Sequence, residues 1–331
     1  MEKILRKFQT QLFGQPVEEI EILDDQSGTT RRTRTRLRLN DGQELSVFIK
    51  RPSRSLIARA FVAVPRLSRA EVGFYTELRD QVPIATPQCH GAGHLWRGFI
   101  VVLEDLTDSG ATLRRSTDTL SVDEAASLLA SLAAMHKQWW GRTESHPWLA
   151  RNPQRELKLG ALLSPSLCRL GLWRVGSAVP DSLRQPISRY ARNRRVGQAT
   201  MAVGPTTLIH NDCHPGNQFV AADGRPGLID WQLCRAGPWA RDVAYLLATS
   251  LEPETRRSAE RELLADYLNQ LGPVAPTVDE AWLAYRRNVV YALEAMLVTA
   301  AVGVMMPKST SLVLVNRAAT AAADLDSFGA L

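Results

Sequence analysis

The segment "LIHNDCHPGNQF", residues 208–219, carries two histidines, an aspartate, a cysteine and two asparagines within positions 210–217. The polar residues follow directly on the apolar pair Leu208–Ile209. Polar groups packed this densely indicate a functional site. Their types leave open a metal cage, a nucleophile with its base, or another kind of catalytic loop, and the residues that follow favour one of these.

A second acid stands thirteen residues downstream of Asn217, namely Asp230 in "GLIDWQ", residues 227–232. The intervening residues 218–229, "QFVAADGRPGLI", read as two short strands around a D-G turn, which predicts a β-hairpin. Residues at the open end of a hairpin lie close together, so we expect Asn217 and Asp230 to meet. An amide oxygen and a carboxylate suit Mg²⁺ when phosphates and water complete its shell. The pair therefore predicts magnesium bound together with a phosphate substrate.

The spacing in sequence between Asp212 and Asn217 is informative. Asp212 precedes it by five residues and follows His210 by two, the H-x-D-x-x-x-x-N spacing of a kinase catalytic loop. In such a loop the aspartate orients the attacking hydroxyl or accepts its proton. The spacing therefore favours phosphate transfer.

Two rival interpretations use the same segment. Zinc bound by His210, Cys213 and His214 lacks a supporting cysteine pair. A nucleophilic Cys213 activated by His214 is disfavoured because adjacent loop residues rarely point at one another, and no G-x-S-x-G turn is present. The four cysteines lie far apart without a C-x-x-C pair, which argues against a disulfide framework and indicates a reducing, cytoplasmic location.

The remaining sequence predicts a small β-rich part followed by a larger helical part. Residues 17–50 alternate as three antiparallel strands, with "DDQSGTT" and "NDG" as turns. Residues 68–80 predict a helix and 98–106 an apolar strand. Residues 121–140 predict a helix that begins with a capping box of Ser121 and Glu124. Long helices then continue to the C-terminus, and His136 is interpreted as a core histidine.

Two segments raise the possibility of other partners. "RRTRTRLRL", residues 31–39, holds five arginines in a chain of net charge +6, which could mark a nucleic-acid patch. Arg34, Arg36 and Arg38 alternate with Thr35, Leu37 and Leu39, so we interpret them as the solvent face of an edge strand and expect no nucleic-acid partner. Residues 289–306, "VVYALEAMLVTAAVGVMM", are marginal for a membrane span and contain Glu294, so a buried helix is expected and no membrane partner.

"LIHNDCHPGN" followed by "GLIDWQ" resembles the aminoglycoside phosphotransferase and choline kinase family, including its ecdysteroid-kinase-like branch. The resemblance continues through "GPWARDVAYLL", residues 237–247. It implies a two-lobed α+β protein-kinase-like fold: a small antiparallel-sheet lobe at 1–103, a hinge at 104–107, and a larger, mainly helical lobe at 108–331. The family usually has glycine where Asn211 stands, and asparagine can adopt the same left-handed backbone.

The resemblance also implies an activity, namely ATP- and Mg²⁺-dependent transfer of the γ-phosphate to a hydroxyl of a small molecule. Asp212 would align that hydroxyl, and Asn217 and Asp230 would hold the Mg²⁺. Asp242 would bind the backbone of the catalytic loop and, with His210, support the site structurally.

The N-terminal lobe would bind the nucleotide. The resemblance implies that Lys50, at the end of "VFIK", neutralises the α- and β-phosphates and that Glu71 pairs with it, with Glu77 as the weaker candidate. The turn with Ser27 and Gly28 would cover the phosphates, although it lacks a G-x-G-x-x-G pattern. The adenine would bind to the carbonyl of Glu104 and the amide of Leu106.

The acceptor is less well defined by the sequence. No acidic cluster is evident and residues 155–199 are rich in arginine, which disfavours polycationic aminoglycosides and choline. A neutral or anionic acceptor is therefore expected, such as a nucleoside antibiotic, a macrolide, a sterol, a sugar or another metabolite, acted on by a monomer or homodimer. A nucleotide-binding scaffold without turnover is the alternative. A protein kinase is disfavoured because "DWQ" leads directly into "GPWARD" without an activation segment.

Overall fold

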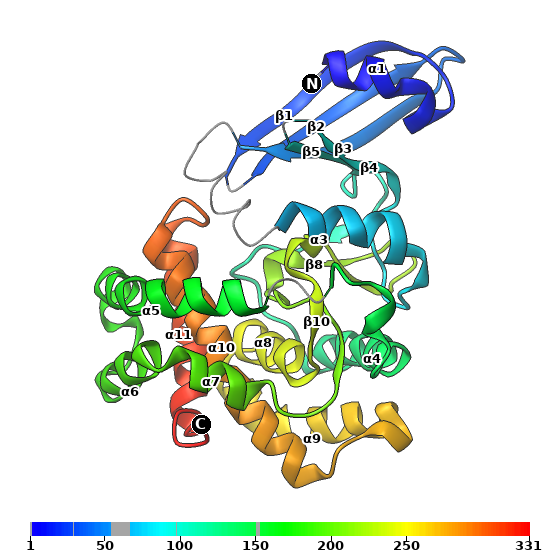
Figure 1. Ribbon diagram of the computed structural model, residues 1–331. Coiled ribbons are helices and arrows are strands. Elements are labelled where there is room, and N and C mark those ends of the chain that lie inside the picture. The colour runs from blue at the N-terminus through cyan, green and yellow to red at the C-terminus, as the bar shows by residue number, and fades with distance from the viewer. Residues whose placement is uncertain (1, 29, 54–66, 97, 150–152) are drawn as a thin grey trace. The chain divides into compact units, whose positions relative to one another are not determined.

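The computed structural model describes residues 2–28, 30–53, 67–96, 98–149 and 153–331, which form two compact units (Figure 1). Unit 1 consists of Met1–Leu113, Phe219–Arg225 and Ile229–Gln232. Unit 2 consists of Arg114–Gln218, Pro226–Leu228 and Leu233–Leu331. The lobe and hinge boundaries expected from the sequence stay predictions.

Unit 1 is built on an antiparallel sheet of five strands in the order β1-β2-β3-β5-β4. The strands are β1 (Val17–Ser27), β2 (Thr30–Leu39), β3 (Glu44–Pro52), β4 (Cys89–Leu95) and β5 (Gly98–Glu104). Helix α1 (Glu2–Phe13) lies along this sheet (Figure 1). The fold is thus the mixed α and β class that the sequence predicted, with an antiparallel N-terminal sheet and a helical C-terminal part.

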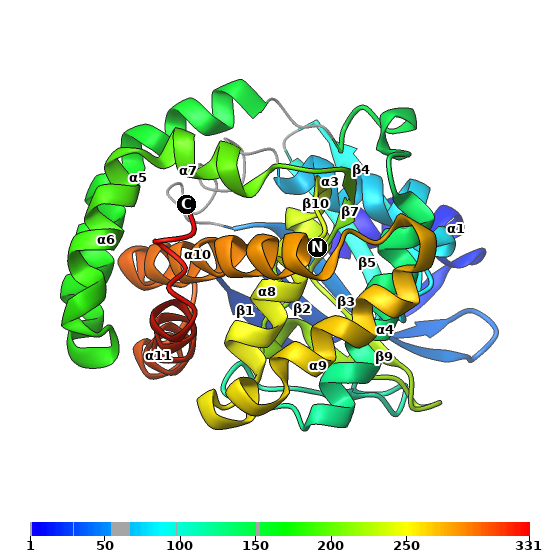
Figure 2. The same cartoon turned by 90° about the horizontal axis from the view of Figure 1, so that it is seen from below.

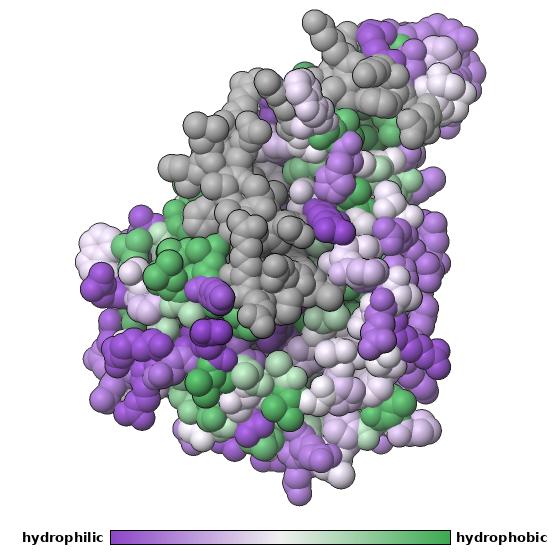
Figure 3. All heavy atoms as spheres, in the orientation of Figure 1, coloured by the Kyte–Doolittle hydropathy of each residue, from purple (hydrophilic) through white to green (hydrophobic). Residues whose placement is uncertain are grey.

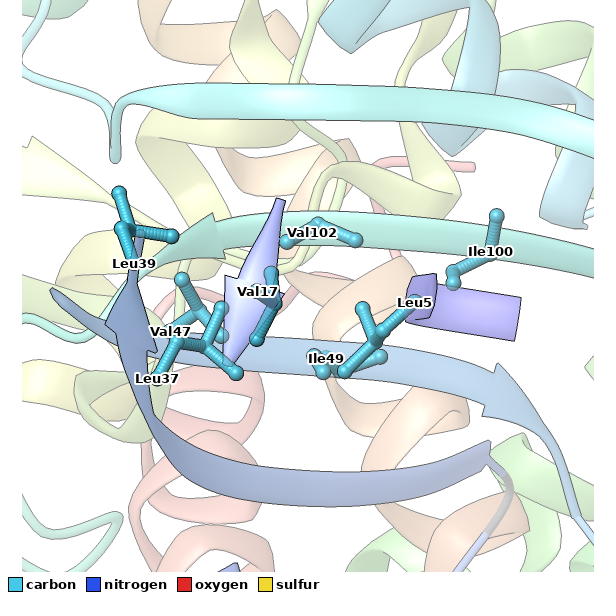
Figure 4. Packing of buried hydrophobic residues seen from close by; sticks show 8 residues of the cluster. All are labelled: Leu5, Val17, Leu37, Leu39, Val47, Ile49, Ile100 and Val102. Carbon is cyan, nitrogen blue, oxygen red and sulfur yellow. The ribbon is translucent and has the colours of Figure 1, made fainter. Parts of the chain in front are cut away.

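The alternation along β2 creates one face of the core of unit 1. Leu37 and Leu39 are buried, and they pack with Leu5 of α1 and with Val47 and Ile49 of β3 (Figure 4). The alternation was predicted correctly, but the position of the strand was not. β2 lies between β1 and β3, so it is an interior strand, and the edge strands of this sheet are β1 and β4.

Strand β1 extends further than the sequence suggested. "DDQS", which was expected to belong to a turn, forms the last four residues of β1. Asp25 accepts hydrogen bonds from the side chains of Arg31 and Thr33 on the neighbouring strand. The bond from Arg31 lowers the pKa of Asp25 to about 2. Aspartate is unfavourable in strands, and these cross-strand contacts stabilise it there.

The helical segment that follows the sheet's third strand has three parts: α3 (Leu67–Gly73), a π-helical turn η1 (Phe74–Leu78) and a 3₁₀ turn η2 (Arg79–Gln81). Val72, Tyr75 and Leu78 are buried. The ring of Phe74 stacks on Trp231, with 3.8 Å between the ring centroids. This stacking fixes the segment that contains Asp230 against the helix.

Two later segments of the chain, Phe219–Arg225 and Ile229–Gln232, also belong to unit 1. β6 (Thr112–Leu113) pairs with β8 (Gln218–Val220) through Leu113 and Phe219. Beyond β8 the chain turns through a hydrogen bond from the Ala221 amide to the Arg225 carbonyl (2.9 Å) and enters β9 (Pro226–Leu228). The two short strands and the turn match the sequence prediction for this segment.

Unit 2 is mainly helical, with one strand pair of β7 (Thr206–Ile209) and β10 (Arg235–Pro238). Helix α10 lies between α5 and α8 (Figure 2). The helices are α4 (Val122–Trp139), α5 (Pro153–Val175), α6 (Asp181–Arg192), α7 (Arg194–Met201), α8 (Ala240–Ser250), α9 (Pro253–Leu271), α10 (Val278–Val302) and α11 (Lys308–Asp324).

The apolar stretch at 289–306 lies mostly in α10, inside unit 2. Its acid, Glu294, is buried and binds the guanidinium of Arg194 (2.5 Å) and the hydroxyl of Tyr190 (2.7 Å). A buried carboxylate is stable when it is paired and hydrogen-bonded in this way. The prediction of a buried helix is therefore confirmed. Among the described residues, no helix combines the length and apolar composition needed to cross a membrane.

Some apolar side chains of unit 2 remain at the surface. Leu162 and Trp173 of α5 are 74% and 76% exposed. Figure 3 shows hydrophobic side chains gathering on the helical part of the molecule at the level of α5.

Candidate active site

The opening segment forms a loop between two strands. β7 ends in the buried pair Leu208–Ile209, and the chain then turns sharply at Asn211, whose φ is +71°. Asparagine tolerates this left-handed conformation better than other residues with a side chain. Further on, a 3₁₀ turn begins at Pro215, and the ring Nδ1 of His214 accepts a hydrogen bond from the Gly216 amide (3.1 Å).

Asp242 anchors this loop from the first turn of α8. Its carboxylate accepts hydrogen bonds from the backbone amides of His210 (2.7 Å) and Asn211 (2.6 Å), the contact that the resemblance implied. His136 contacts the same carboxylate (3.3 Å) and is fully buried, which agrees with its interpretation as a core histidine. Burial alone would raise the pKa of Asp242, but the hydrogen bonds and charges of the histidines outweigh it and lower the pKa.

Asp212 and Asn217 contact each other within this loop. The side-chain amide of Asn217 donates to the backbone carbonyl (2.9 Å) and to the carboxylate (3.0 Å) of Asp212. Only the nitrogen can donate these bonds, so the Asn217 Oδ1 points elsewhere and stays available as an oxygen ligand. Asp212 itself keeps a side chain that is 16% exposed.

Tyr245 is a residue of the site that the sequence reasoning missed. Its phenol is fully buried and lies close enough to Asp212 to feel the charge of that carboxylate. Burial, with the nearby Asp212 charge, raises the pKa of Tyr245 well above its ordinary value, so the phenol stays protonated. The available signal was its position three residues after Asp242, on the same face of a predicted helix.

The structure does not support the rival interpretations of the loop. Cys213 is fully buried, and burial together with Asp242 and Asp212 raises the pKa of its thiol well above the ordinary value. A protonated, inaccessible thiol is not a nucleophile. In the part of the chain that the structure describes, no three His, Cys, Asp or Glu side chains are arranged to hold a metal ion.

Unit 1 contains a second cluster, around Lys50 at the end of β3. Its ammonium contacts the carboxylates of Glu71 (2.5 Å) and Asp230 (2.9 Å). Burial alone would lower the pKa of Lys50, but Asp230 and Glu71 outweigh it and raise the pKa, so the ammonium remains charged. Glu71 is 1% exposed whereas Glu77 is exposed, so the structure selects Glu71 as the partner.

Asp230 occupies an unusual backbone position in this cluster. Its φ is +63°, which turns the chain two residues after the buried Leu228 and directly before the buried Trp231. One of its carboxylate oxygens contacts Lys50 and the other contacts the guanidinium of Arg32 (3.4 Å). The side chain of Asp230 is 12% exposed, so the carboxylate remains accessible.

These residues fit a magnesium ion chemically. Asp230 supplies a carboxylate and Asn217 an amide oxygen with its orientation fixed by Asp212, which are hard oxygen ligands of the kind that Mg²⁺ accepts. Asp230 belongs to unit 1 and Asn217 to unit 2. Their meeting at one ion stays a prediction.

The residues expected at the adenine lie at the end of β5 and just beyond. Glu104 accepts a hydrogen bond on its side chain from the Gln88 amide (2.9 Å), and Leu106 packs with Phe219. Both line a cavity of about 590 Å³ that contains none of the Lys50 cluster. This cavity is therefore separate from the Lys50 cluster. The adenine contacts stay predictions.

The residues expected to cover the phosphates lie at the end of β1. Ser27 is the last residue of the strand, opposite Arg31, and the Gly28 amide donates to the Thr30 carbonyl (3.0 Å). The turn between β1 and β2 is therefore short. Its contact with phosphates stays a prediction.

Known structures resemble the whole chain in fold. An aminoglycoside phosphotransferase from Alicyclobacillus acidocaldarius is 17% identical, with a TM-score of 0.51 over 93% of this chain and 92% of that chain. A macrolide 2'-phosphotransferase from Brachybacterium faecium is 17% identical, with a TM-score of 0.50 over 93% and 99%. A spectinomycin phosphotransferase in complex with ADP and its antibiotic is 13% identical, with a TM-score of 0.52 over 98% of each chain.

No curated protein matches the sequence. The sequence profile described as the phosphotransferase enzyme family matches residues 34–282, which include both the Lys50 cluster and the catalytic loop. Since this match covers most of the chain, the protein belongs to the phosphotransferase enzyme family.

Proposed function

We propose that the protein is a small-molecule kinase that transfers the γ-phosphate of ATP to a hydroxyl of its acceptor. The observation that carries this proposal is the cluster of Lys50, Glu71 and Asp230. A buried ammonium held between two carboxylates costs desolvation energy, so its retention needs a purpose beyond stability. Binding a polyphosphate with its metal provides one.

The chemical steps follow from the positions of the side chains. Asp212 accepts a hydrogen bond from the acceptor hydroxyl, orients its oxygen towards the γ-phosphorus and receives the proton. As the new oxygen–phosphorus bond forms, the bond between the γ-phosphorus and the bridging β-phosphate oxygen breaks and ADP leaves. Asn217 holds the Asp212 carboxylate, while Asp242 holds the backbone of His210 and Asn211 just before it. Catalysis of this kind consists mainly of positioning and charge neutralisation.

The nucleotide would be bound mainly by unit 1. Lys50, oriented by Glu71, neutralises the phosphates that are not transferred, and Ser27 and Gly28 cover them. Asp230 and Asn217 would hold Mg²⁺, which when bound neutralises the charge of the triphosphate oxygens. The carbonyl of Glu104 and the amide of Leu106 would bind the adenine edge. The ADP complex of the spectinomycin phosphotransferase supports a nucleotide of this type.

The acceptor class is inferred from the fold neighbours and from the charge of the chain. Some neighbours are named as macrolide 2'-, aminoglycoside and spectinomycin phosphotransferases, and others as choline kinase and putative fructosamine-3-kinase, so these names allow several kinds of small-molecule acceptor. The net charge of +6 disfavours a polycationic ligand. We infer a neutral or anionic hydroxylated metabolite or antibiotic as the acceptor.

Location and partners are inferred from the same features. None of the four cysteines forms a disulfide, and three of them are buried, which supports a reducing compartment and a cytoplasmic enzyme. Described arginines of β2 form ion pairs with acids, so they do not support a nucleic-acid surface. A monomer or homodimer acting on a small molecule is proposed.

A panel of hydroxylated metabolites and antibiotics, screened for ADP release, tests the proposal. We expect release that requires Mg²⁺ and one class of small molecule, with no protein acceptor. ATP binding without release for any acceptor would instead support a scaffold that binds nucleotide without turnover.

A further inference from the structure

The arginines of β2 do not share one role. Four of the five pair with acids that lie outside the Lys50 cluster: Arg31 with Asp25, Arg34 with Asp105, Arg36 with Glu21, and Arg38 with Glu19 and Glu44. Arg32 alone among these five contacts a residue of the cluster, Asp230.

The position of Arg32 follows from the strand register. Arg32 lies directly opposite Lys50 in the pairing of β2 with β3. Directly opposed residues of an antiparallel pair project from the same face of the sheet. Two cations placed in this way repel each other, and here Glu71 and Asp230 compensate them. The four side chains carry two positive and two negative charges.

The contacts of Arg32 and Lys50 differ in strength. Lys50 is 3% exposed and tied at 2.5 Å to Glu71 as well as at 2.9 Å to Asp230. The Arg32 side chain is 41% exposed and contacts the second oxygen of Asp230 at 3.4 Å. An exposed ion pair is screened by water and breaks at little cost, whereas breaking a buried, hydrogen-bonded pair leaves a buried charge uncompensated. A ligand that competes for Asp230 therefore displaces Arg32 rather than Lys50.

We propose that Arg32 is a second phosphate-binding cation, which Asp230 holds until a nucleotide with its metal arrives and which then binds the phosphate chain beside Lys50. This inference rests on the proposed function. A guanidinium matches the oxygens of phosphate with two parallel hydrogen bonds, which the compact ammonium of Lys50 cannot make. Loss of Arg32 also leaves the cluster with one net negative charge, which repels a triphosphate.

Calorimetric titration of adenosine, ADP and ATP into the wild type and Arg32→Ala tests the inference without measuring turnover. We expect Arg32→Ala to weaken ATP binding about tenfold or more, since a hydrogen bond to a charged group contributes at least about this much. Adenosine has no phosphate, so its affinity should be unchanged. Arg32→Lys keeps the charge and should recover part of the loss.

Arg36→Ala is the matched control, because Arg36 lies on the same strand and face but pairs with Glu21. It should bind all three ligands as the wild type does. Equal losses for adenosine and ATP, or an Arg32→Ala variant with wild-type ATP affinity, would overturn the inference alone. A wild-type protein that binds no ATP would overturn the proposed function and this inference with it.

Discussion

At the residue scale, the site depends on two backbone positions that most side chains avoid. Asn211 and Asp230 both have positive φ, at +71° and +63°. Asn211 turns the chain so that its amide and that of His210 both reach the Asp242 carboxylate. The left-handed backbone is therefore what positions the catalytic loop.

Substitution of Asn211 tests this dependence. Asn211→Gly should retain activity and stability, because glycine adopts positive φ without strain. Asn211→Ala should be about 1 kcal/mol less stable than the glycine variant, since its Cβ is strained in the left-handed region. Urea denaturation compares the two, and equal stabilities would show that this backbone conformation is not required.

The Lys50 and Glu71 pair provides a second prediction at this scale. Lys50→Ala should lower kcat/KM for ATP about 10²-fold or more, as expected for loss of a group that neutralises transition-state charge. Glu71→Gln should give a milder loss, because Lys50 remains but is less well oriented. The double variant should be little worse than Lys50→Ala, since a shared interaction is lost only once.

Glu77→Gln is the control for this cycle, because Glu77 is exposed on the same helical segment. It should behave as the wild type. Strictly additive effects of the Lys50 and Glu71 substitutions would contradict their coupling.

At the scale of elements, the helix that carries His136 begins as the sequence predicted. The Ser121 side chain accepts from the Glu124 amide (3.2 Å), and the Glu124 side chain accepts from the Ser121 amide (2.8 Å). Ser121→Ala should lower the free energy of unfolding by about 1 kcal/mol, because it leaves a helix amide unsatisfied.

Thermal or urea denaturation measures this effect. Ser127→Ala, an exposed substitution inside the same helix, is the control and should be neutral or slightly stabilising. Equal stability of Ser121→Ala and the wild type would mean that the capping box contributes nothing to the helix.

Local chemistry explains which elements were predictable. The capping box, the alternation of β2 and the short strands around the D-G turn follow from residues close in sequence. The full length of β1 does not, because "DDQS" reads as a turn until Asp25 meets Arg31 across the strands. The interior position of β2 likewise depends on its pairing with β1 and β3. The residues of a single strand do not determine which strands lie on either side of it.

The same distinction holds in the site. The pairing of Lys50 with Glu71 and the contact of Asp242 with the loop backbone were expected from the family resemblance. Arg32 and Tyr245 were missed because each joins the site through a contact between distant segments. Arg32, for example, reaches Asp230 across 198 residues of sequence.

At the scale of the whole molecule, the chain does not divide at a single point. Phe219–Arg225 and Ile229–Gln232 belong to the compact unit formed mainly by the first 113 residues, although they follow the catalytic loop. The segment with Asp230 thus lies in the same unit as Lys50 and Glu71. Tertiary packing within this unit, such as the stacking of Trp231 on Phe74, holds the returning segment in place.

The central claim is that Asp212 positions the acceptor hydroxyl while other residues bind the nucleotide. The most direct measurement compares acceptor-dependent ADP release and ATP affinity in the wild type and in Asp212→Asn, with Asp223→Asn of the exposed β8–β9 turn as the control. We predict that Asp212→Asn lowers kcat about 10²–10⁴-fold and leaves ATP affinity nearly unchanged. Turnover close to that of the wild type in Asp212→Asn would contradict the account.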